Sequence, residues 1–361
     1  MSDSKLLNGT VYELKYVDVF WEMYLPDSRN FTSEARQYSI AGWALLAQKW
    51  VHYDGALKLA LGAISLNTIG QELGKEWMIH EGRKLYGAAL QGMASSVKNL
   101  HRKNQNAIIM TSRILSLFEV LFGDGDLAKR YRDWSGHVSG EEAIMMLTKP
   151  ENYINRDAHD LLCDGRLRSS TFARKKCLFN DHAWKTVPWW RIRKTEKDKL
   201  IDIILEVPEL LESLDNTIST YDGEQHIVYM QTLAASLLRC EERLKIWHKQ
   251  ASQQLMIGEE AQDATGLAAS HLMSIYWAYR VLIRGVLENH QFYQEIPASA
   301  VSLSEMRDNI LRRTERFSSA KSGWFGKQII GFPVGVAMRF APPAKTGEYP
   351  AICETVSARL S

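Results

Sequence analysis

Apolar residues recur at alternating spacings of three and four along most of this 361-residue chain. In one segment they stand at Tyr229, Leu233, Leu237, Cys240, Leu244 and Trp247. That alternation puts apolar side chains on one face of a helix. The charged residues of the same segment are Glu241, Glu242, Arg243 and Lys245. We expect this second face of the helix to lie in solvent.

A later segment repeats the pattern, with apolar residues at Leu272, Tyr276, Tyr279, Ile283 and Val286. Neither the alternation typical of strands nor a repeat of fixed period is visible anywhere in the sequence. The chain is therefore predicted to be all-α, an irregular multi-helix array that forms one domain over residues 1–361.

Short polar signatures predict where some helices begin and end. Ser139 with Glu142, and Ser302 with Glu305, have the spacing of a capping box, which starts a helix. Residues 123–125, Gly-Asp-Gly, predict the end of another helix.

The segment over about 323–350 is the one part that does not look helical. It is both apolar and rich in glycine and proline, an unusual combination for a loop in solvent. We predict a loop packed over the core. The alternative is a lid or pocket wall, since long loops often carry functional sites, and Trp324 and Phe325 are then ligand-binding candidates.

The stretch from Tyr53 to Ile154 carries a series of motifs. They are Ala56-Leu57-Lys58-Leu59-Ala60-Leu61-Gly62-Ala63, Tyr86-Gly-Ala-Ala-Leu90, Leu115-Ser-Leu-Phe-Glu119, Trp134-Ser-Gly-His137-Val-Ser-Gly140 and Met145-Met-Leu-Thr-Lys-Pro-Glu-Asn-Tyr-Ile154. Later come Pro188-Trp189-Trp190, Pro208-Glu-Leu-Leu211 and Ile275-Tyr276-Trp277-Ala278.

Together these motifs resemble the regulatory domain of fungal zinc-cluster transcription factors over most of residues 15–355. The family has a Trp-x-x-His-x-x-Gly-Ala turn that leads into a leucine helix. Here Glu141 and Glu142 precede Ala143, a slight departure. The resemblance implies an all-helical domain of a transcriptional regulator, which senses a metabolite or binds a partner. It also implies that Glu119 and His137 recur in the family, and a buried polar anchor is the simplest account of both.

The cysteines do not form a zinc cluster. They are Cys163, Cys177, Cys240 and Cys353, with no Cys-x-x-Cys pair among them. A tetrahedral zinc site needs closely spaced thiolates. We therefore expect no metal, no cofactor and no direct sequence-specific DNA binding. The polar beginning at Met1 resembles a native start, which favours a stand-alone copy of the regulatory domain.

The most apolar helices contain charged residues, among them Arg113, Glu119, Arg280 and Arg284. We expect neither a signal peptide nor membrane insertion. The expected location is cytoplasmic, or nuclear if the chain is a regulator.

The segment 165–199 has eleven Lys and Arg residues against three Asp and Glu residues, a net charge of +8 in a chain of net charge +2. It also contains Trp184, Trp189 and Trp190. Basic residues among tryptophans can bind a phosphate backbone and stack bases. Because no recognition-helix spacing accompanies them, we favour a solvated segment that connects helices.

Known catalytic motifs are missing from the sequence, so the candidates come from one apolar helix. Arg280 and Arg284 lie one turn apart and could clamp a carboxylate or an enone oxygen, with His271 and Tyr276 as further donors and Trp277 as a ligand-binding residue. The alternative is structural. Arg284 then pairs with Glu288 and points to water.

Two functions compete. The first is a repurposed domain in fungal specialised metabolism that binds an apolar small molecule and promotes a cofactor-free intramolecular cyclisation of the Diels–Alder or pericyclic type. The second is a transcriptional regulator or co-regulator of a biosynthetic gene cluster that lacks its own DNA-binding module. A homodimer is compatible with both. We favour the cyclisation catalyst narrowly, with the small molecule as substrate or, for the regulator, as effector.

Overall fold

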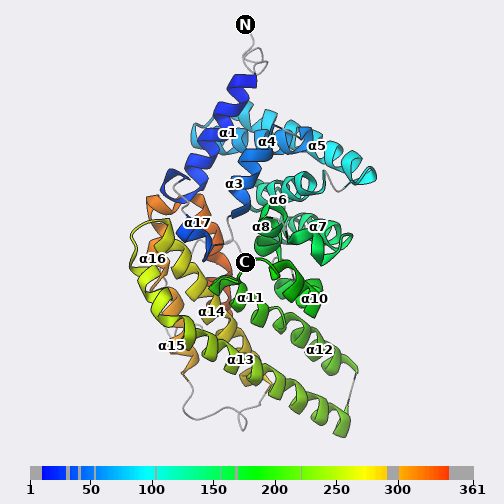
Figure 1. Ribbon diagram of the computed structural model, residues 1–361, viewed down its shortest axis with the longest axis vertical. Helices are drawn as coiled ribbons and strands as arrows, with labels where there is room; N and C mark the ends of the chain where they lie inside the picture. The colour runs from blue at the N-terminus through cyan, green and yellow to red at the C-terminus, as the bar shows by residue number, and fades with distance from the viewer. Residues whose placement is uncertain are drawn as a thin grey trace. The chain divides into compact units, whose positions relative to one another are not determined.

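The computed structural model describes residues 10–29, 33–39, 42–52, 54–101, 104–154, 156–166, 170–220, 222–290 and 301–340. Within these ranges every regular element is a helix and there is no strand, so the all-α prediction is confirmed (Figure 1). None of the described helices is both long enough and apolar enough to span a membrane.

The chain divides into two compact units. Unit 1 is residues 1–29 and 40–165, and unit 2 is residues 30–39 and 166–361. The chain therefore leaves unit 1, contributes a short segment to unit 2 and returns before it enters unit 2 again. This division does not test whether the two units form one domain, and the single-domain interpretation stays a prediction.

Unit 1 is an array of long helices joined by short turns. Its elements are α1 (Thr10–Tyr24), η2 (Pro26–Arg29), α3 (Gly42–Trp50), α4 (Gly55–Glu72), α5 (Glu76–Lys98), α6 (Gln105–Phe122), α7 (Leu127–Met146), η3 (Pro150–Tyr153) and α8 (Arg156–Gly165). α6 is buried on nearly all sides, as expected of a helix at the centre of a core. It packs against α4 and α7.

The helices α4 and α5 pack at very short range, and glycine makes this possible. A Cβ atom added to Gly82 on α5 would lie 2.1 Å from Nδ2 of Asn67 on α4. The close contact leaves no room for a side chain at that position. One end of the pair carries a cluster of Leu66, Ile69 and Met78, covered by apolar side chains of α1.

Unit 2 is built around α14. Its elements are α2 (Ser33–Arg36), α9 (Ser170–Ala173), η4 (Leu178–Asn180), α10 (His182–Thr186), η5 (Val187–Trp189), α11 (Glu196–Ile204), α12 (Val207–Thr220), α13 (Gly223–Glu260), α14 (Ala264–Asn289), α15 (Leu303–Leu311), α16 (Thr314–Ser318), η7 (Ala320–Ser322), α17 (Gly323–Ile329) and α18 (Gly331–Phe340). α14 is buried on nearly all sides and packs against α13, α15, α18 and α2.

The short segment Ser33–Ser39 belongs to unit 2 through specific contacts. Nζ of Lys197 donates a hydrogen bond of 2.7 Å to the carbonyl oxygen of Ser39. Nε2 of Gln254 donates to Oε1 of Gln37 at 3.2 Å. These contacts join the segment to α11 and α13, which lie far from it in sequence.

Some predicted helix boundaries are confirmed and one is wrong. Ser302 caps α15 and accepts a hydrogen bond from the backbone N–H of Glu305, and Gly123 ends α6. Ser139, in contrast, lies inside α7, which Asp126 caps instead. The predicted turn over residues 134–140 is also helix. A capping box is a short signature, and it caps only where the backbone leaves the helical conformation.

The prediction of a loop over about 323–350 is wrong for residues 323–340, the part that the structure describes. Residues 323–329 and 331–340 form α17 and α18, and residues 341–350 lie outside the described residues. Two conformational facts make the glycines and proline compatible with helices. Gly323 takes a positive φ of 59° just where α17 begins. Pro333 stands in the first turn of α18, where a helix needs no backbone N–H donor.

Candidate functional site

A buried carboxylate on α13 joins the two candidate arginines of α14. Oε1 of Glu241 lies 3.1 Å from Nη2 of Arg280, and Oε2 lies 2.7 Å from Nε of Arg284. The Nε–H of Arg284 does not point along this contact, so the contact is an ion pair rather than a linear hydrogen bond. Glu241 is only 1% exposed and the two arginines are nearly as buried.

Arg280 and Arg284 are neighbours, as their spacing on one helix predicts, but their shared partner was not predicted from the sequence. Arg284 contacts Glu241 and is buried, so the prediction that it pairs with Glu288 and points to water is wrong. Glu241 was expected in solvent with its three charged neighbours, and this too is wrong. Tyr229, expected on the buried face of the same helix, is exposed, and Met230 is buried in its place.

Aromatic side chains complete this group, which we call the Glu241 cluster: Glu241, Arg280, Arg284, Tyr276, Trp277 and His248. Nη1 of Arg280 donates to the hydroxyl of Tyr276 at 3.3 Å, and its guanidinium carbon lies 5.1 Å from the centre of the Trp277 ring. The His248 ring stacks on Tyr276 with 4.7 Å between centroids. The predicted residues Tyr276, Trp277, Arg280 and Arg284 therefore form one cluster.

The Glu241 cluster contains more positive than negative charge. One carboxylate faces two guanidinium groups, and Nη2 of Arg284 is buried without a hydrogen-bond partner. Burial, followed by the charge of Arg280, lowers the pKa of His248, so the imidazole does not add to the positive charge at neutral pH. Burial raises the pKa of Tyr276, which keeps the phenol protonated.

His271 lies apart from this cluster. It stands nine residues before Arg280 on α14, which corresponds to about 13 Å along a helix axis. Its Nε2 donates a hydrogen bond of 3.1 Å to the carbonyl oxygen of Ile329, at the end of α17. Burial lowers the pKa of His271 to about 4, so the ring is neutral at pH 7. This histidine joins two helices within unit 2.

The two ligand-binding candidates of the predicted loop lie on α17. Phe325 is buried and Trp324 is half-buried. Neither is part of the Glu241 cluster as its contacts define it. The single predicted site thus corresponds to two separate places, one around Glu241 and one where α17 meets His271.

Unit 1 contains a second polar network, of which only Glu119 and His137 were predicted as buried polar anchors. The hydroxyl of Tyr86 on α5 donates to Glu119 on α6 and lies 3.1 Å from Nε2 of His137 on α7. Burial raises the pKa of Glu119, and both burial and Glu119 raise the pKa of Tyr86. The network connects three helices. Tyr86 opens one of the sequence motifs, and that position was the available signal.

Unit 1 also buries an ion pair that no sequence motif marked. Nη2 of Arg113 on α6 lies 2.6 Å from Oε1 of Glu141 on α7, and the same guanidinium donates to the carbonyl oxygen of Leu161. Both charged side chains are almost fully buried. A Cβ atom at Gly165 would lie 2.5 Å from this guanidinium, so the glycine leaves the space that the arginine fills.

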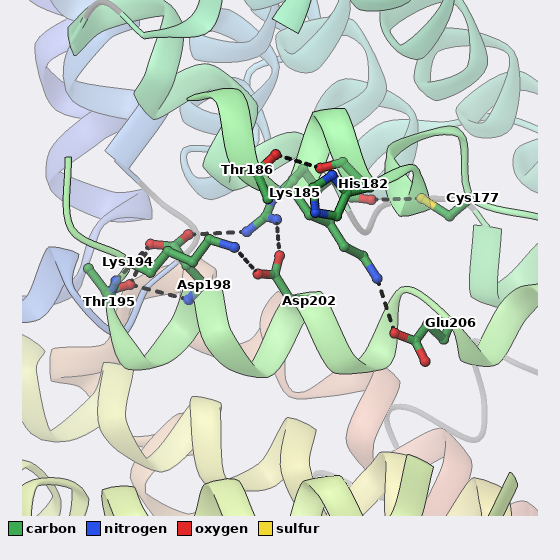
Figure 2. A network of polar contacts seen from close by, with 10 residues as sticks. Cys177, His182, Lys185, Thr186, Lys194, Thr195, Asp198, Asp202 and Glu206 are labelled. Atoms are coloured by element: carbon green, nitrogen blue, oxygen red, sulfur yellow. Dashed lines mark hydrogen bonds and ion pairs between the residues drawn. The ribbon is translucent and has the colours of Figure 1, made fainter. Parts of the chain in front are cut away.

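Most of the described cations of the basic segment 165–199 have a partner within unit 2. Figure 2 shows Asp202 in contact with Lys194, while Arg166 lies 2.5 Å from Asp202 and 3.2 Å from Asp198. Asp198 also caps α11 through Thr195, so one carboxylate serves a cation and a helix end. The segment was predicted to be a solvated connection between helices, but it contains the short elements α9, η4, α10 and η5, and Arg166 is buried rather than solvated.

Within the described residues, no group of three or more His, Cys, Asp or Glu side chains is arranged to hold a metal ion. No protein family, curated protein or solved structure was found that matches the chain. The resemblance to the regulatory domain of fungal zinc-cluster transcription factors therefore stays a prediction from the sequence motifs.

Proposed function

We propose that this chain is a helical regulatory domain that acts through binding, as a regulator or co-regulator of genes of fungal specialised metabolism. The observation that carries the proposal is that Glu241 binds both Arg280 and Arg284. In the cyclisation hypothesis these arginines polarise a substrate. Here both guanidinium groups already bind a buried carboxylate, which supports a role in joining α13 to α14.

The sequence resemblance and the lack of known catalytic motifs support the same choice. A domain of this kind needs a stable helical scaffold and a surface or site that responds to a ligand or partner. The buried networks around Glu241, Arg113 and Tyr86 each connect two or more helices within one unit. They are suited to the scaffold part of that role.

A tethered reporter assay tests the proposal. The full chain is fused to an unrelated DNA-binding module, and transcription of a reporter is compared with that given by the module alone. We expect the fusion to change the reporter signal several-fold. Glu241→Gln should abolish the change because it breaks the core, whereas the exposed neighbour variant Glu242→Gln should preserve it. Equal signals from the fusion and the bare module, at equal protein levels, would refute the regulator.

A cofactor-free cyclisation of an apolar substrate, of the Diels–Alder or pericyclic type, is the second candidate. One observation favours it: Nη2 of Arg284 is a buried donor without a partner, on the helix that also carries Tyr276 and Trp277. A buried donor of this kind could polarise a carbonyl oxygen of a substrate held beside it. Glu241 would then hold the guanidinium in position.

The test of the second candidate follows metabolites. Purified protein is incubated with an organic extract of a producing fungus that lacks this gene, against a boiled control, and the products are followed by mass spectrometry. A new isomer of unchanged mass, formed by the wild type and lost in Arg284→Met, would establish the catalyst. An unchanged profile, or the same isomer from Arg284→Met, would reject Arg284 as the donor.

A further inference from the structure

We propose that Trp190, Arg191 and Arg193 form a docking surface for an acidic peptide segment of a partner protein that also presents an apolar side chain. We call these three residues the Trp190 surface. The inference goes beyond the proposed function, since it holds whether the chain regulates genes or catalyses a reaction. It rests on a comparison of all the cations in the basic segment.

Most cations of segment 165–199 have a partner within unit 2. The segment has eleven, of which Arg168 lies outside the residues whose side chains are described. Eight of the other ten make a hydrogen bond or ion pair: Arg166, Arg174, Lys175, Lys176, Lys185, Lys194, Lys197 and Lys199. Arg191 and Arg193 remain, and both are exposed.

The two remaining arginines closely follow an exposed tryptophan in the chain. Trp190 is 79% exposed, the largest exposed fraction among the large hydrophobic side chains of the described residues. Trp184 and Trp189 of the same segment are buried, so only Trp190 is available to a partner. Tryptophan and arginine are the residues most enriched among those that dominate the binding energy of protein interfaces.

The backbone that presents this surface is held in place. Trp189 lies between two cations, with Arg166 at 4.2 Å and Lys194 at 4.9 Å from its ring centre. The backbone N–H of Trp190 donates to the carbonyl oxygen of Val187, and that of Ile192 donates to Trp189. A surface that is ordered before binding loses less conformational entropy when a partner docks.

Charge decides among the kinds of partner. Two cations are too few for a membrane surface, where clusters of about four to eight are typical, or for the many phosphate contacts of nucleic-acid binding. A peptide with two or so carboxylates beside one apolar side chain matches two arginines and one indole ring.

A displayed library of random 12-residue peptides tests the proposal. It is selected on the full wild-type chain and counter-selected on the double variant Arg191→Glu with Arg193→Glu. We expect enriched peptides with at least two Asp or Glu residues next to a Leu or Phe. A synthetic copy of one such peptide should bind Trp190→Ala at least tenfold more weakly than wild type in fluorescence anisotropy, in line with the loss of a dominant interface residue.

Matched variants separate this surface from general charge effects. Arg239→Glu with Lys249→Glu makes the same charge change on exposed positions of α13, and Trp77→Ala removes another partly exposed tryptophan. Both should bind the peptide as wild type does, and all variants should keep the wild-type melting temperature. No enrichment, enrichment of neutral or basic peptides, or equal binding to Trp190→Ala would each overturn the proposal. So would binding of an oligothymidine or of phosphatidylserine vesicles that is lost with the same substitutions, because it would assign the surface to another class of partner.

Discussion

Both units bury an ion pair between their central helix and the helix that packs beside it, but the charges balance in only one. In unit 1, Arg113 of α6 meets Glu141 of α7, one cation against one anion. In unit 2, Arg280 and Arg284 of α14 share the single carboxylate of Glu241 on α13. Arg113 leaves one guanidinium nitrogen, Nη1, without a hydrogen bond, whereas Arg284 leaves two, Nε and Nη2. Unit 2 therefore has both the excess positive charge and the larger number of unpaired donors.

The difference in charge indicates which of the two buried clusters would be stabilised by binding a further anion. A balanced buried pair has little to gain from a further ion. A buried cluster with an excess positive charge is stabilised by any anion or polar oxygen that reaches it, since an uncompensated buried charge is costly. If an effector or substrate acts on the core of this protein, the Glu241 cluster is the place where its binding changes stability most.

The largest effect should come from loss of the shared carboxylate. Glu241→Gln leaves two buried guanidinium groups without an anion, whereas Glu141→Gln leaves one that still donates to Leu161. Breaking a buried pair costs about 3–5 kcal/mol, and we expect Glu241→Gln to exceed Glu141→Gln. Urea unfolding followed by circular dichroism measures both, with the exposed variant Glu242→Gln as control. Equal losses in the two units would contradict the difference in charge count.

Removal of one arginine should destabilise unit 1 more than unit 2, the reverse of the order expected for loss of the carboxylates. Arg113→Met leaves Glu141 buried without its cation and should cost about 3–5 kcal/mol. Arg284→Met removes only the excess charge, since Arg280 still binds Glu241, and should cost about 1 kcal/mol or less. The same unfolding measurement decides. A loss from Arg284→Met as large as that from Arg113→Met would show that the second arginine is needed for packing.

Acid should weaken unit 2 before unit 1. Folding lowers the pKa of His271 from 6.5 to about 4. Between these two pH values the imidazole is protonated in the unfolded chain and neutral in the folded chain. Stability through His271 is therefore complete above pH 6.5 and is lost as the pH falls toward 4, by about 3 kcal/mol at about 1.4 kcal/mol per pH unit. Glu119 in unit 1 has a raised pKa, so its contribution is present at low pH and is lost as the pH rises.

Hydrogen exchange of peptides from α14 and α6, measured between pH 4 and pH 7 with correction for the intrinsic rate, separates the two units. Protection of α14 against exchange should decrease as the pH falls from 7 to 4. Titration of Glu119 should not decrease the protection of α6 over the same range. His271→Gln should flatten the response of α14, whereas His101→Gln, at an exposed position, should leave it unchanged. A steep response in His271→Gln would assign the acid sensitivity to another group.

The smallest effects set the baseline for these comparisons. Lys175 pairs with Glu212 and Lys176 with Glu209 at the surface of unit 2. Solvent and salt screen such pairs, so Lys175→Ala and Lys176→Ala should leave the melting temperature within the error of the measurement. A clear loss from either would mean that the connecting segment depends on its surface charges as well as on Arg166.

The sequence predicted the helices of this protein better than it predicted their partners. Spacing alone predicted α14 as a helix, and the five apolar residues that it selected are all buried, but so are most of the other residues of this helix. Spacing failed for Glu241, since the contact with Arg280 joins positions 39 residues apart and its local surroundings are typical of a solvated face. Ser139 shows the converse error, a local signature that the longer helix overrides.

The residues of the candidate site were likewise predicted only in part from the sequence. The residues of α14 that form the cluster could be selected because they share one apolar helix with two arginines. Their separation from His271 follows from helix geometry and could have been calculated. The contributions of Glu241 and His248 could not, because they depend on how α13 packs against α14. The helical state of residues 323–340 was hidden by glycines and a proline that happen to stand where a helix tolerates them.

The path of the chain has a consequence for its synthesis. Residues 33–39 leave the ribosome before residues 40–165 of unit 1, and Lys197 and Gln254, which bind this segment, follow long afterwards. During synthesis the segment therefore cannot form these native contacts until more than a hundred further residues have been added. For the same reason a cut after residue 165 does not yield two complete pieces: the first keeps a segment that it cannot use, and the second lacks the hydrogen bonds to Gln37 and Ser39 that fasten α13 and α11.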